Sequence, residues 1–367
     1  MFDNVYAGRR VLVTGHTGFK GSWLSTWLLE LGATVAGYSV DIPTHPSHFE
    51  AIRLKERLSH YQADVRDRLD LFRVFDDFRP EIVFHLAAQA LVSRSYDDPI
   101  GTFEVNAFGT MNVLDCLRQR PDVRAAVFVT SDKCYRNAEW VWGYRETDHL
   151  GGDDPYSGSK ACAELLCHSY YHSFFKHING PCIATARAGN VIGGGDWAAN
   201  RIVPDCVRAW SSGLAVAIRS PQATRPWQHV LEPLSGYLWL GANLWHRRTK
   251  IDGGAFNFGP DASVNQPVEK LIATIADYWP AATWRPQQLG PTEHKTEANL
   301  LKLSCDKALA ELGWKATLSF GESVRLTAQW YRQFYASSET DHCDVSRQQI
   351  FEYCDLARSK GQIWSTE

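Results

Sequence analysis

Residues 10–21 have the sequence Arg10-Val-Leu-Val-Thr14-Gly15-His-Thr-Gly18-Phe-Lys-Gly21. The first five residues are typical of a short β-branched strand, and the apolar spacing that follows, through Leu31, predicts a helix. Glycines permit a tight turn between strand and helix and let a ligand approach the backbone closely. The N-terminus of the helix offers unpaired N–H groups to a pyrophosphate. This stretch therefore predicts the start of an α/β sheet with a dinucleotide site.

The three glycines follow a G-x-x-G-x-x-G spacing, which differs from the G-x-G-x-x-G fingerprint. The prediction of a dinucleotide site therefore depends on the strands and the helix that flank them. A second strand, Thr34 to Val40, ends at Asp41, twenty residues past Gly21. A carboxylate there accepts both ribose hydroxyls of adenosine and repels a 2′-phosphate, which favours NAD over NADP. The alternative for Asp41 is a turn residue that begins a loop.

Strands and helices continue to alternate along the next hundred residues. Residues 61–65 predict a third strand end, which places Asp64 and Val65 beside the adenine, although Asp64 could instead cap the helix that begins near Leu69. The strand Ile82 to Leu86 runs into small residues, against which a cofactor can lie. A long helix is expected from Pro99 to Arg120. Repeated βαβ units predict a doubly wound, parallel Rossmann sheet.

The apolar run Ala125 to Val129 predicts a buried parallel strand. Thr130, Ser131, Asp132 and Lys133 follow it directly. Open α/β sheets place their ligand crevice at the carboxyl ends of the strands, so these four polar side chains are expected to face a site and not the core.

Tyr156 and Lys160 are four residues apart, just after Pro155. If Asp153 or Asp154 caps a helix there, both side chains project from one helix face. A nearby ammonium group lowers the pKa of a phenol, which would make Tyr156 a usable proton acceptor near neutral pH. A Tyr-x-x-x-Lys pattern also arises by chance on helices, so this motif is weak evidence when taken alone.

A further strand is predicted from Cys182 to Ala188, and the alternation then breaks. We expect a Rossmann domain made of residues 1–188 plus about 230–250. A smaller, mostly helical C-terminal lobe for the substrate would take about 189–229 plus 251–335. Residues 336–367 form an extension to which the sequence assigns no role, with a short helix near Val345 to Leu356.

Composition excludes several classes of protein. The 367 residues carry a formal charge of −3 and no long basic run, which argues against a nucleic-acid partner. No stretch is long and apolar enough for a membrane span or a signal core, so a cytoplasmic location is expected. Nine scattered cysteines without a Cys-x-x-Cys pair suggest neither disulfides nor a metal site. Cys134 is expected to be a buried, inert thiol, and His85 a core histidine.

Taken together, the motifs resemble those of extended short-chain dehydrogenases/reductases of the nucleotide-sugar branch, from about Arg9 to Trp314. The resemblance is carried by Gly15-x-x-Gly18-x-x-Gly21, His85-Leu-Ala-Ala-Gln89, Tyr156-x-x-x-Lys160 and Arg187-x-Gly-Asn190, in the family's order. It implies a bound NAD and a nucleotide-sugar substrate held by the C-terminal lobe. It also implies homodimers, or dimers of dimers, built through the helices around Asn106 and Lys160.

The resemblance assigns site residues position by position. Those expected to bind NAD are Gly15, Thr17, Gly18, Phe19, Lys20, Gly21, Asp41, Asp64, Val65, Leu86, Ala87, Ala88, Gln89, Asn106, Thr130, Tyr156 and Lys160. Asn190, Arg201 and Arg225 resemble positions that hold the sugar diphosphate, and a guanidinium at Arg225 suits a phosphate, with a surface salt bridge as its alternative role.

The residues after the strand at 125–129 distinguish the reactions within this branch. Sugar 4-epimerases lack an acid and a base there, whereas 4,6-dehydratases carry Thr-Asp-Glu; this chain has Ser131-Asp132-Lys133, which resembles the dehydratases that act on CDP-glucose. The resemblance implies that Tyr156, supported by Ser131 and Lys160, removes the C4 hydroxyl proton. Asp132 would protonate the departing C6 hydroxyl, and Lys133, directly or through water, would remove the C5 hydrogen.

Four alternatives remain open at the level of sequence. The nucleotide could be dTDP or GDP, because no base-reading residue is identifiable. An epimerase or a simple sugar-nucleotide dehydrogenase could use the same fold, although neither needs an acid and a base beside the tyrosine. A catalytically silent NAD-sensing protein is a further possibility, because fold alone does not establish function.

Overall fold

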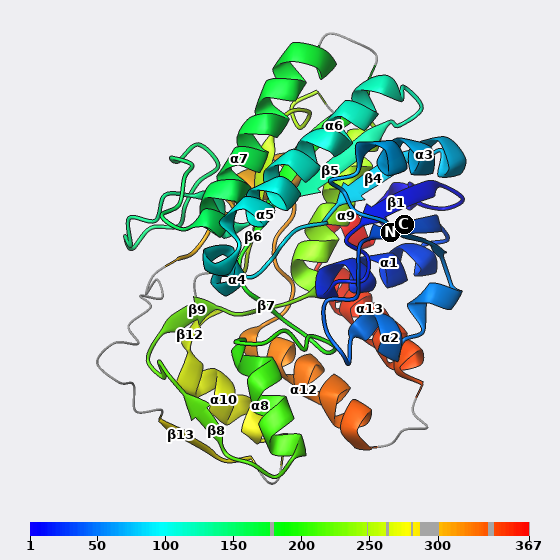
Figure 1. Cartoon of the computed structure of the whole chain (residues 1–367). Helices are drawn as coiled ribbons and strands as arrows, with labels where there is room; N and C mark the ends of the chain where they lie inside the picture. Colours follow the sequence, from blue (N-terminus) through cyan, green and yellow to red (C-terminus); the bar gives the residue numbers. More distant parts are fainter. Residues whose placement is uncertain are drawn as a thin grey trace.

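The computed structural model describes residues 1–176, 180–247, 249–261, 264–279, 282–286, 301–336 and 341–366. Within these residues, a seven-stranded parallel sheet forms the centre of the molecule (Figure 1). Its order reverses next to the first strand, which is the place where doubly wound sheets bind their ligands. From edge to edge the strands are β11 (Ala255–Phe258), β6 (Cys182–Ala188), β5 (Ala125–Val129), β4 (Ile82–His85), β1 (Arg10–Thr14), β2 (Thr34–Ser39) and β3 (Ser59–Gln62).

Alternate side chains of each strand supply two separate cores. Val11 and Val13 belong to the larger cluster, whereas Leu12 belongs to the smaller one on the opposite face of the sheet. Such strands are apolar on both faces because helices cover both. The larger core packs against α1 (Phe19–Glu30) and α9 (Leu231–Trp245), and the smaller against α3 (Arg68–Phe78), α6 (Gly109–Gln119) and α7 (Pro155–Tyr170).

Helix caps explain where two of these helices begin. The side chain of Asp154 accepts a hydrogen bond from the backbone N–H of Ser157, with Pro155 at the first helical position, as predicted. Asp67 caps α3, so the alternative role of Asp64 as a helix cap is wrong.

The long predicted helix is present as α5 (Pro99–Phe103), a π-helical turn over Glu104–Phe108, and α6. Among the described residues, none of the helices has the length and hydropathy to cross a membrane.

The predicted domain boundaries assign one strand of the central sheet to the second lobe, which is wrong. Residues 251–335 were assigned to the second lobe, but β11 pairs in parallel with β6 and extends the central sheet. The helix α11 (Asp306–Leu312) also joins the Rossmann domain, because Lys307 donates to the carbonyl of Ala255 and Trp239 of α9 donates to that of Leu312. These segments are short, and their pairing partners lie far away in the sequence, so local pattern does not locate them.

The second lobe lies beyond the carboxyl end of the sheet (Figure 1). It combines helices with two-stranded pairings, and residues 287–300 of its predicted range lie outside the described residues. A further short pair, β7 (Val191–Ile192) with β10 (Gln228–His229), lies where the chain enters and leaves the lobe. The lobe contains α8 (Ile202–Ser211), α10 (Val268–Ala276), β8 (Val216–Ile218) paired with β13 (Trp284–Pro286), and β9 (Thr224–Pro226) paired with β12 (Asn265–Pro267).

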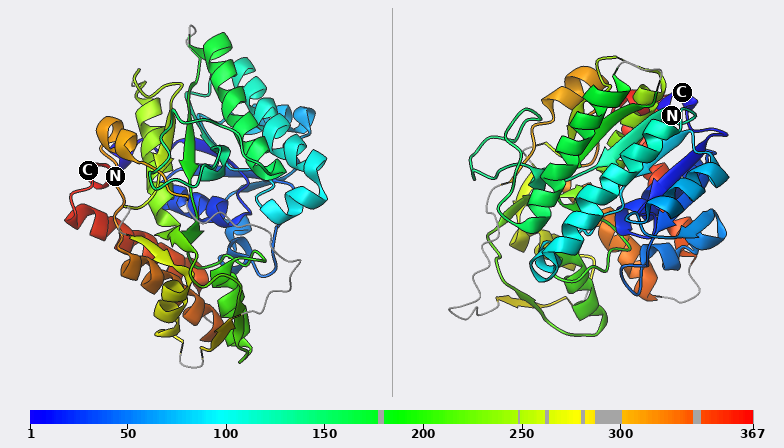
Figure 2. Two further views of the ribbon diagram at one scale, coloured as in Figure 1. Left: turned by 90° about the vertical axis from the view of Figure 1, so that its left-hand side faces the viewer. Right: turned by 45° about the horizontal axis from the view of Figure 1, so that its top comes forward.

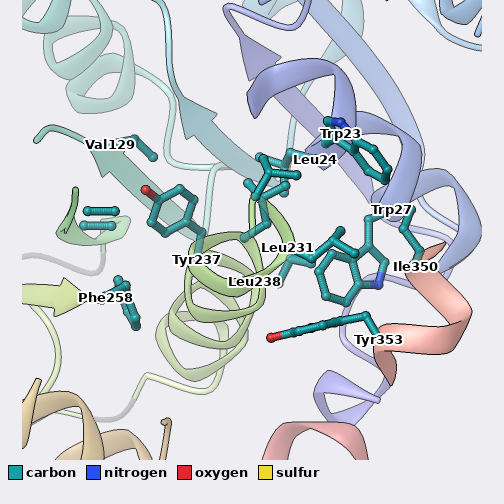
Figure 3. Packing of buried hydrophobic residues seen from close by; sticks show 14 of the residues in the cluster. Trp23, Leu24, Trp27, Val129, Leu231, Tyr237, Leu238, Phe258, Ile350 and Tyr353 are labelled. Carbon is teal, nitrogen blue, oxygen red and sulfur yellow. The ribbon is translucent and has the colours of Figure 1, made fainter. Parts of the chain in front are cut away.

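The last residues are an integral part of the Rossmann domain. The helix α13 (His342–Ser359) lies beside α1, and α12 (Phe320–Ala336) packs against α13 and against α10 of the second lobe. Leu231, Trp27, Ile350 and Tyr353 lie in one packed layer (Figure 3). Ser346 of α13 hydrogen bonds to His48 at 3.0 Å, and His48 in turn to Ser22 of α1 at 2.8 Å. The predicted helix near 345–356 is thus confirmed and extends further at both ends.

The two chain termini lie side by side (Figure 2). The ring of Trp364 stacks on Phe2 at 5.0 Å and on Tyr353 at 5.6 Å, and it is fully buried. The C-terminal extension therefore closes the core beneath α1, which shows a structural role that its polar composition did not reveal.

We expect Trp364→Ala to lower the free energy of unfolding by about 3–5 kcal/mol, because it leaves a large cavity between the two termini. Chemical denaturation would measure the change. Ile363→Ala is the matched control, because the neighbouring side chain is 52% exposed and its loss should cost less than about 1 kcal/mol. Equal effects of the two substitutions would contradict a buried C-terminus.

Candidate active site

The glycine turn lies against the end of β4, at the switch point of the sheet. Gly15 has φ +76°, and a Cβ atom there would lie 2.7 Å from the backbone nitrogen of Ala87. Leu86 and Ala87 donate backbone hydrogen bonds to Thr14. No side chain caps the start of α1 at Gly18, so its first N–H groups face outward toward a ligand. This cradle fits a dinucleotide.

Of the residues predicted near the adenosine, Asp41 fits best. It is exposed just past β2, and Thr17 of the glycine turn donates to its carbonyl oxygen at 2.6 Å. Asp64 forms an ion pair with Arg66 at 2.7 Å, so its carboxylate already has a partner. Val65 is buried, with its side chain directed at Gly109 of α6. The role of all three in adenosine binding stays a prediction.

Asn106 connects two predicted cofactor segments. Its amide oxygen accepts from the backbone N–H of Gln89 at 2.8 Å, and its amide nitrogen donates to the carbonyl of Gln89 and to Ser159 Oγ of α7. Asn106 therefore fastens the loop after β4, which includes Ala88, to the helix that carries Tyr156.

Beyond β5 the chain turns through a short 3₁₀ helix, Asp132–Cys134. The Ser131 hydroxyl accepts from the backbone N–H of Lys133 and donates to Asp132 Oδ1 at 3.0 Å. Gly189, at the end of the neighbouring β6, makes room for this carboxyl, because a Cβ atom there would lie 2.9 Å from Asp132 Oδ2. Lys133 itself is half-buried beside them.

Asp132 is almost completely buried. Burial raises the pKa of its carboxyl above the ordinary value, although Lys133, the Ser131 hydrogen bond and Lys20 act in the opposite direction. A raised pKa favours the protonated form of the carboxyl, which is the form that a general acid needs. Lys20 reaches this position from the first turn of α1, and burial lowers the pKa of its ammonium to about 8.

Tyr156 and Lys160 lie on one helix, α7, as predicted, and both are buried. The predicted direction of the tyrosine's shift is wrong for the protein alone: burial raises the pKa of Tyr156 to about 12, although Ser131 and the charge of Arg201 act to lower it. Burial also lowers the pKa of Lys160 to about 8, while Glu164 acts to raise it. Desolvation exceeds the effect of the neighbouring charges at both groups.

A buried ion pair beneath these residues was missed by the sequence argument. Glu164 accepts two hydrogen bonds from Arg187, through Nε at 2.8 Å and Nη2 at 2.7 Å, and both side chains are less than 5% exposed. Thr130 and Thr185 donate to the same carboxylate. Burial acts to raise the pKa of Glu164, but Arg187 and the hydrogen bonds hold it below the ordinary value.

The pair joins a helix to two neighbouring strands of the sheet. Glu164 lies four residues after Lys160 on the same helix, Thr130 follows β5, and Arg187 belongs to β6. Arg187 also donates to the Tyr135 hydroxyl at 2.7 Å, which donates in turn to Asn257 of β11. The spacing of Tyr156, Lys160 and Glu164 was the available clue, because residues at i, i+4 and i+8 share a helix face. Thr130 thus has a structural partner, and its predicted contact with the cofactor stays a prediction.

The predicted diphosphate residues lie at the border between the sheet and the second lobe. Arg201 pairs with Asp196 at 2.8 Å, and its charge acts on the pKa of Tyr156, so it lies close to the catalytic cluster. Asn190 is exposed just past β6. Arg225 is on β9 in the second lobe, where its Nη1 donates to the carbonyl of Thr224. Cys134 and His85 are buried in the core, as expected.

Comparison with known proteins gives the family. The model of the family described as GDP-mannose 4,6 dehydratase matches residues 12–327. The chain belongs to this family. Within it, the chain is 45% identical to CDP-glucose 4,6-dehydratase of Salmonella typhimurium, across 95% of this chain and 97% of that protein. It is 25% identical to a probable dTDP-glucose 4,6-dehydratase of Sinorhizobium fredii, across 88% and 92% of the two chains.

Solved structures of other proteins share the fold of this chain. The UDP-glucose 4-epimerase of Thermus thermophilus, solved in complex with NAD, superposes with a TM-score of 0.74 at 26% identity, covering 88% of this chain and 99% of the epimerase. The fold class predicted from sequence, a parallel Rossmann sheet with a mostly helical C-terminal region, is confirmed.

We expect Arg187→Met to lower the free energy of unfolding by about 3–5 kcal/mol, because it leaves Glu164 buried without its charge partner. Urea denaturation would measure this value. The double substitution Glu164→Gln with Arg187→Met should cost clearly less than the sum of the two single substitutions. Additive costs would show that the two side chains do not depend on each other.

Proposed function

We propose that this protein converts CDP-glucose to CDP-4-keto-6-deoxyglucose and water in an NAD-dependent 4,6-dehydration, as a hydro-lyase. The observation that carries the proposal is the buried carboxyl of Asp132 with its raised pKa, hydrogen bonded to Ser131 and close to Tyr156. An acid of this kind is needed to expel a hydroxyl group as water. The similarity to CDP-glucose 4,6-dehydratase over nearly the whole chain supports the choice of substrate.

The residues present fit NAD. When bound, NAD supplies a hydride acceptor and later a hydride donor, so the reaction consumes no net cofactor. The uncapped start of α1 and Gly15 would hold the pyrophosphate, and Asp41 the adenosine ribose. Asn106 would fasten the loop after β4 to the helix that carries Tyr156.

Tyr156 takes the proton from the C4 hydroxyl as that carbon is oxidised to a ketone. Burial keeps the phenol protonated at neutral pH, so its own proton must pass to solvent water before the phenolate can accept another. Ser131 stabilises the phenolate by a hydrogen bond, and Arg201 favours it by its charge. Lys160 is four residues further along the same helix, and the family resemblance assigns it a supporting role at the tyrosine. The ketone acidifies the hydrogen at C5.

Elimination of water then uses the other two side chains. Lys133, as the neutral amine, removes the C5 proton, directly or through water, and the electron pair of the broken C–H bond forms a C5–C6 double bond. The C6–O bond breaks, and Asp132 gives its proton to the departing hydroxyl, which leaves as water. The new double bond is reduced at C6, and a proton returns to C5.

An epimerase is the second candidate, because the superposed structure is an epimerase. Epimerisation at C4 needs the oxidation and its reversal but no expulsion of a hydroxyl group. It would leave the buried acid and the adjacent Lys133 without a task, so the site favours dehydration.

The proposal also covers where the protein acts, its oligomeric state and the pathway that uses its product. The protein acts in the cytoplasm, without nucleic-acid or membrane partners, as a homodimer or dimer of dimers. Support for an oligomer comes from exposed apolar side chains on the helical segments from α5 to the π-helical turn after α7 (Tyr171–Phe175), namely Ile100, Phe108, Leu165 and Phe174. Its product suits deoxysugar biosynthesis, including that of lipopolysaccharide O-antigen.

Incubation of the purified protein with NAD and one nucleotide sugar at a time tests the function. CDP-glucose should lose one water, detected by mass, and give the alkali-developed absorbance of a 4-keto-6-deoxy sugar. Preferred turnover of dTDP-glucose or GDP-mannose would overturn the substrate and keep the reaction. An isomer of unchanged mass would show an epimerase, and net formation of NADH a simple dehydrogenase.

Asp132→Asn should lower kcat for water release by about 100-fold or more, because the amide cannot protonate the leaving group. The residue keeps its size, so binding of CDP-glucose, measured by calorimetry, should change little. Retention of full water release by this variant would remove Asp132 as the acid.

Arg225→Ala should raise KM for CDP-glucose by about tenfold or more while kcat changes little, because a diphosphate contact binds ground state and transition state alike. Steady-state kinetics would measure both constants. Lys250→Ala, which changes another cation of the chain outside the predicted site, is the control. An unchanged KM would remove Arg225 from the substrate site.

A further inference from the structure

The buried hydroxyl of Tyr237 has no partner in the part of the chain that the structure describes. Its side chain is fully buried on α9, and Oη makes no hydrogen bond there. Buried polar groups in native proteins are nearly always satisfied, so an exception needs a specific explanation. The other fully buried tyrosines all use their hydroxyls: Tyr6, Tyr38, Tyr135, Tyr144, Tyr331 and Tyr353 each make a hydrogen bond.

Tyr237 is directed at the catalytic end of the sheet. Figure 3 shows its hydroxyl turned away from α9 toward Val129, the last residue of β5. Two residues further along the chain is Ser131, followed by Asp132. After burial, the charges that act most on the Tyr237 phenol, raising its pKa, are those of Asp132 and Tyr156. The unpartnered hydroxyl and the candidate acid therefore occupy one buried cluster.

The Asp132 carboxyl has one oxygen available to this hydroxyl. Oδ1 accepts from the side chain of Ser131, whereas Oδ2 receives no side-chain donor from the described residues and lies on the Gly189 side. The backbone N–H of Lys133 also acts on this carboxyl. Lys20 adds a positive charge, with its Nζ 5.9 Å from the centroid of the Tyr237 ring. A donor and a cation beside a carboxyl stabilise the carboxylate that forms when the acid gives up its proton.

We propose that Tyr237 is a positioning residue for Asp132, and that its Oη donates a hydrogen bond to Oδ2 as the carboxyl transfers its proton to the leaving group. The inference rests on the proposed function, in which Asp132 is the acid. The bond is absent while Asp132 is neutral and forms with the carboxylate, so it stabilises the transition state more than the ground state. The ring of Tyr237, packed edge-on against Phe258 and below Lys20, fixes the direction of the hydroxyl.

Tyr237→Phe tests the role, because it removes Oη and keeps the ring. Two substrates are compared in the full-length protein with NAD: CDP-glucose, whose C6 hydroxyl must be protonated to leave, and CDP-6-deoxy-6-fluoroglucose, whose fluoride leaves as an anion. We expect kcat for CDP-glucose to fall about 10- to 100-fold. For the fluoro analogue it should stay within about twofold of the wild type. Asp132→Asn should give the same pattern more strongly.

Tyr6→Phe is the matched control, because Tyr6 is also buried and donates to the carbonyl of Leu238, the residue after Tyr237. It should lower Tm and leave the ratio of the two substrates' rates unchanged. Tyr237→Phe should leave Tm unchanged or raise it, since its hydroxyl is unpaired in the resting protein.

The outcomes separate this inference from the proposed function. If Tyr237→Phe turned over CDP-glucose at the wild-type rate, the role of Tyr237 alone would be overturned. The same conclusion would follow if the variant slowed both substrates equally, or if its Tm fell markedly. If the wild-type protein released neither water nor fluoride, the proposed function would fail, and the role of Tyr237 would fail with it.

Discussion

The buried ion pair between Glu164 and Arg187 is the interaction on which the geometry of the site depends. Two charged groups without access to water are tolerated only when they are paired and their remaining hydrogen-bonding capacity is used. Thr130 and Thr185 donate further hydrogen bonds to the carboxylate of Glu164, and the Tyr135 hydroxyl accepts one from the guanidinium of Arg187. Because these partners come from α7, β5 and β6, the pair fixes the catalytic helix relative to the strand ends.

Above this pair, burial controls the proton affinities of the catalytic groups. The pKa of Asp132 and of Tyr156 is raised, and that of Lys160 and Lys20 is lowered, each mainly by desolvation. Burial thus favours the neutral form of these four groups, and the charges that remain act strongly on one another. Such a site suits a reaction in which protons pass between side chains and a sugar.

The glycines of the site serve this burial by allowing close approach. Gly15 lets the cofactor turn lie against Ala87, and Gly189 lets the neighbouring strand lie against Asp132. A side chain at either position would push the segments apart. Glycines therefore lie at the ends of the strands, where the sheet meets its ligands.

The sequence by itself determined the Rossmann fold, the strand from Cys182 to Ala188 and a helix cap at Asp153 or Asp154, because these follow from local periodicity and capping. The grouping of Ser131, Asp132, Tyr156 and Lys160 followed from the order of the motifs and their family resemblance. Only the tertiary structure decided that β11 joins the sheet, that the C-terminal helices complete the core, and that Tyr156 has a raised pKa. It alone revealed the partners of Glu164 and the unpaired hydroxyl of Tyr237. Pairing and desolvation depend on residues far apart in the chain, and local sequence carries no record of them.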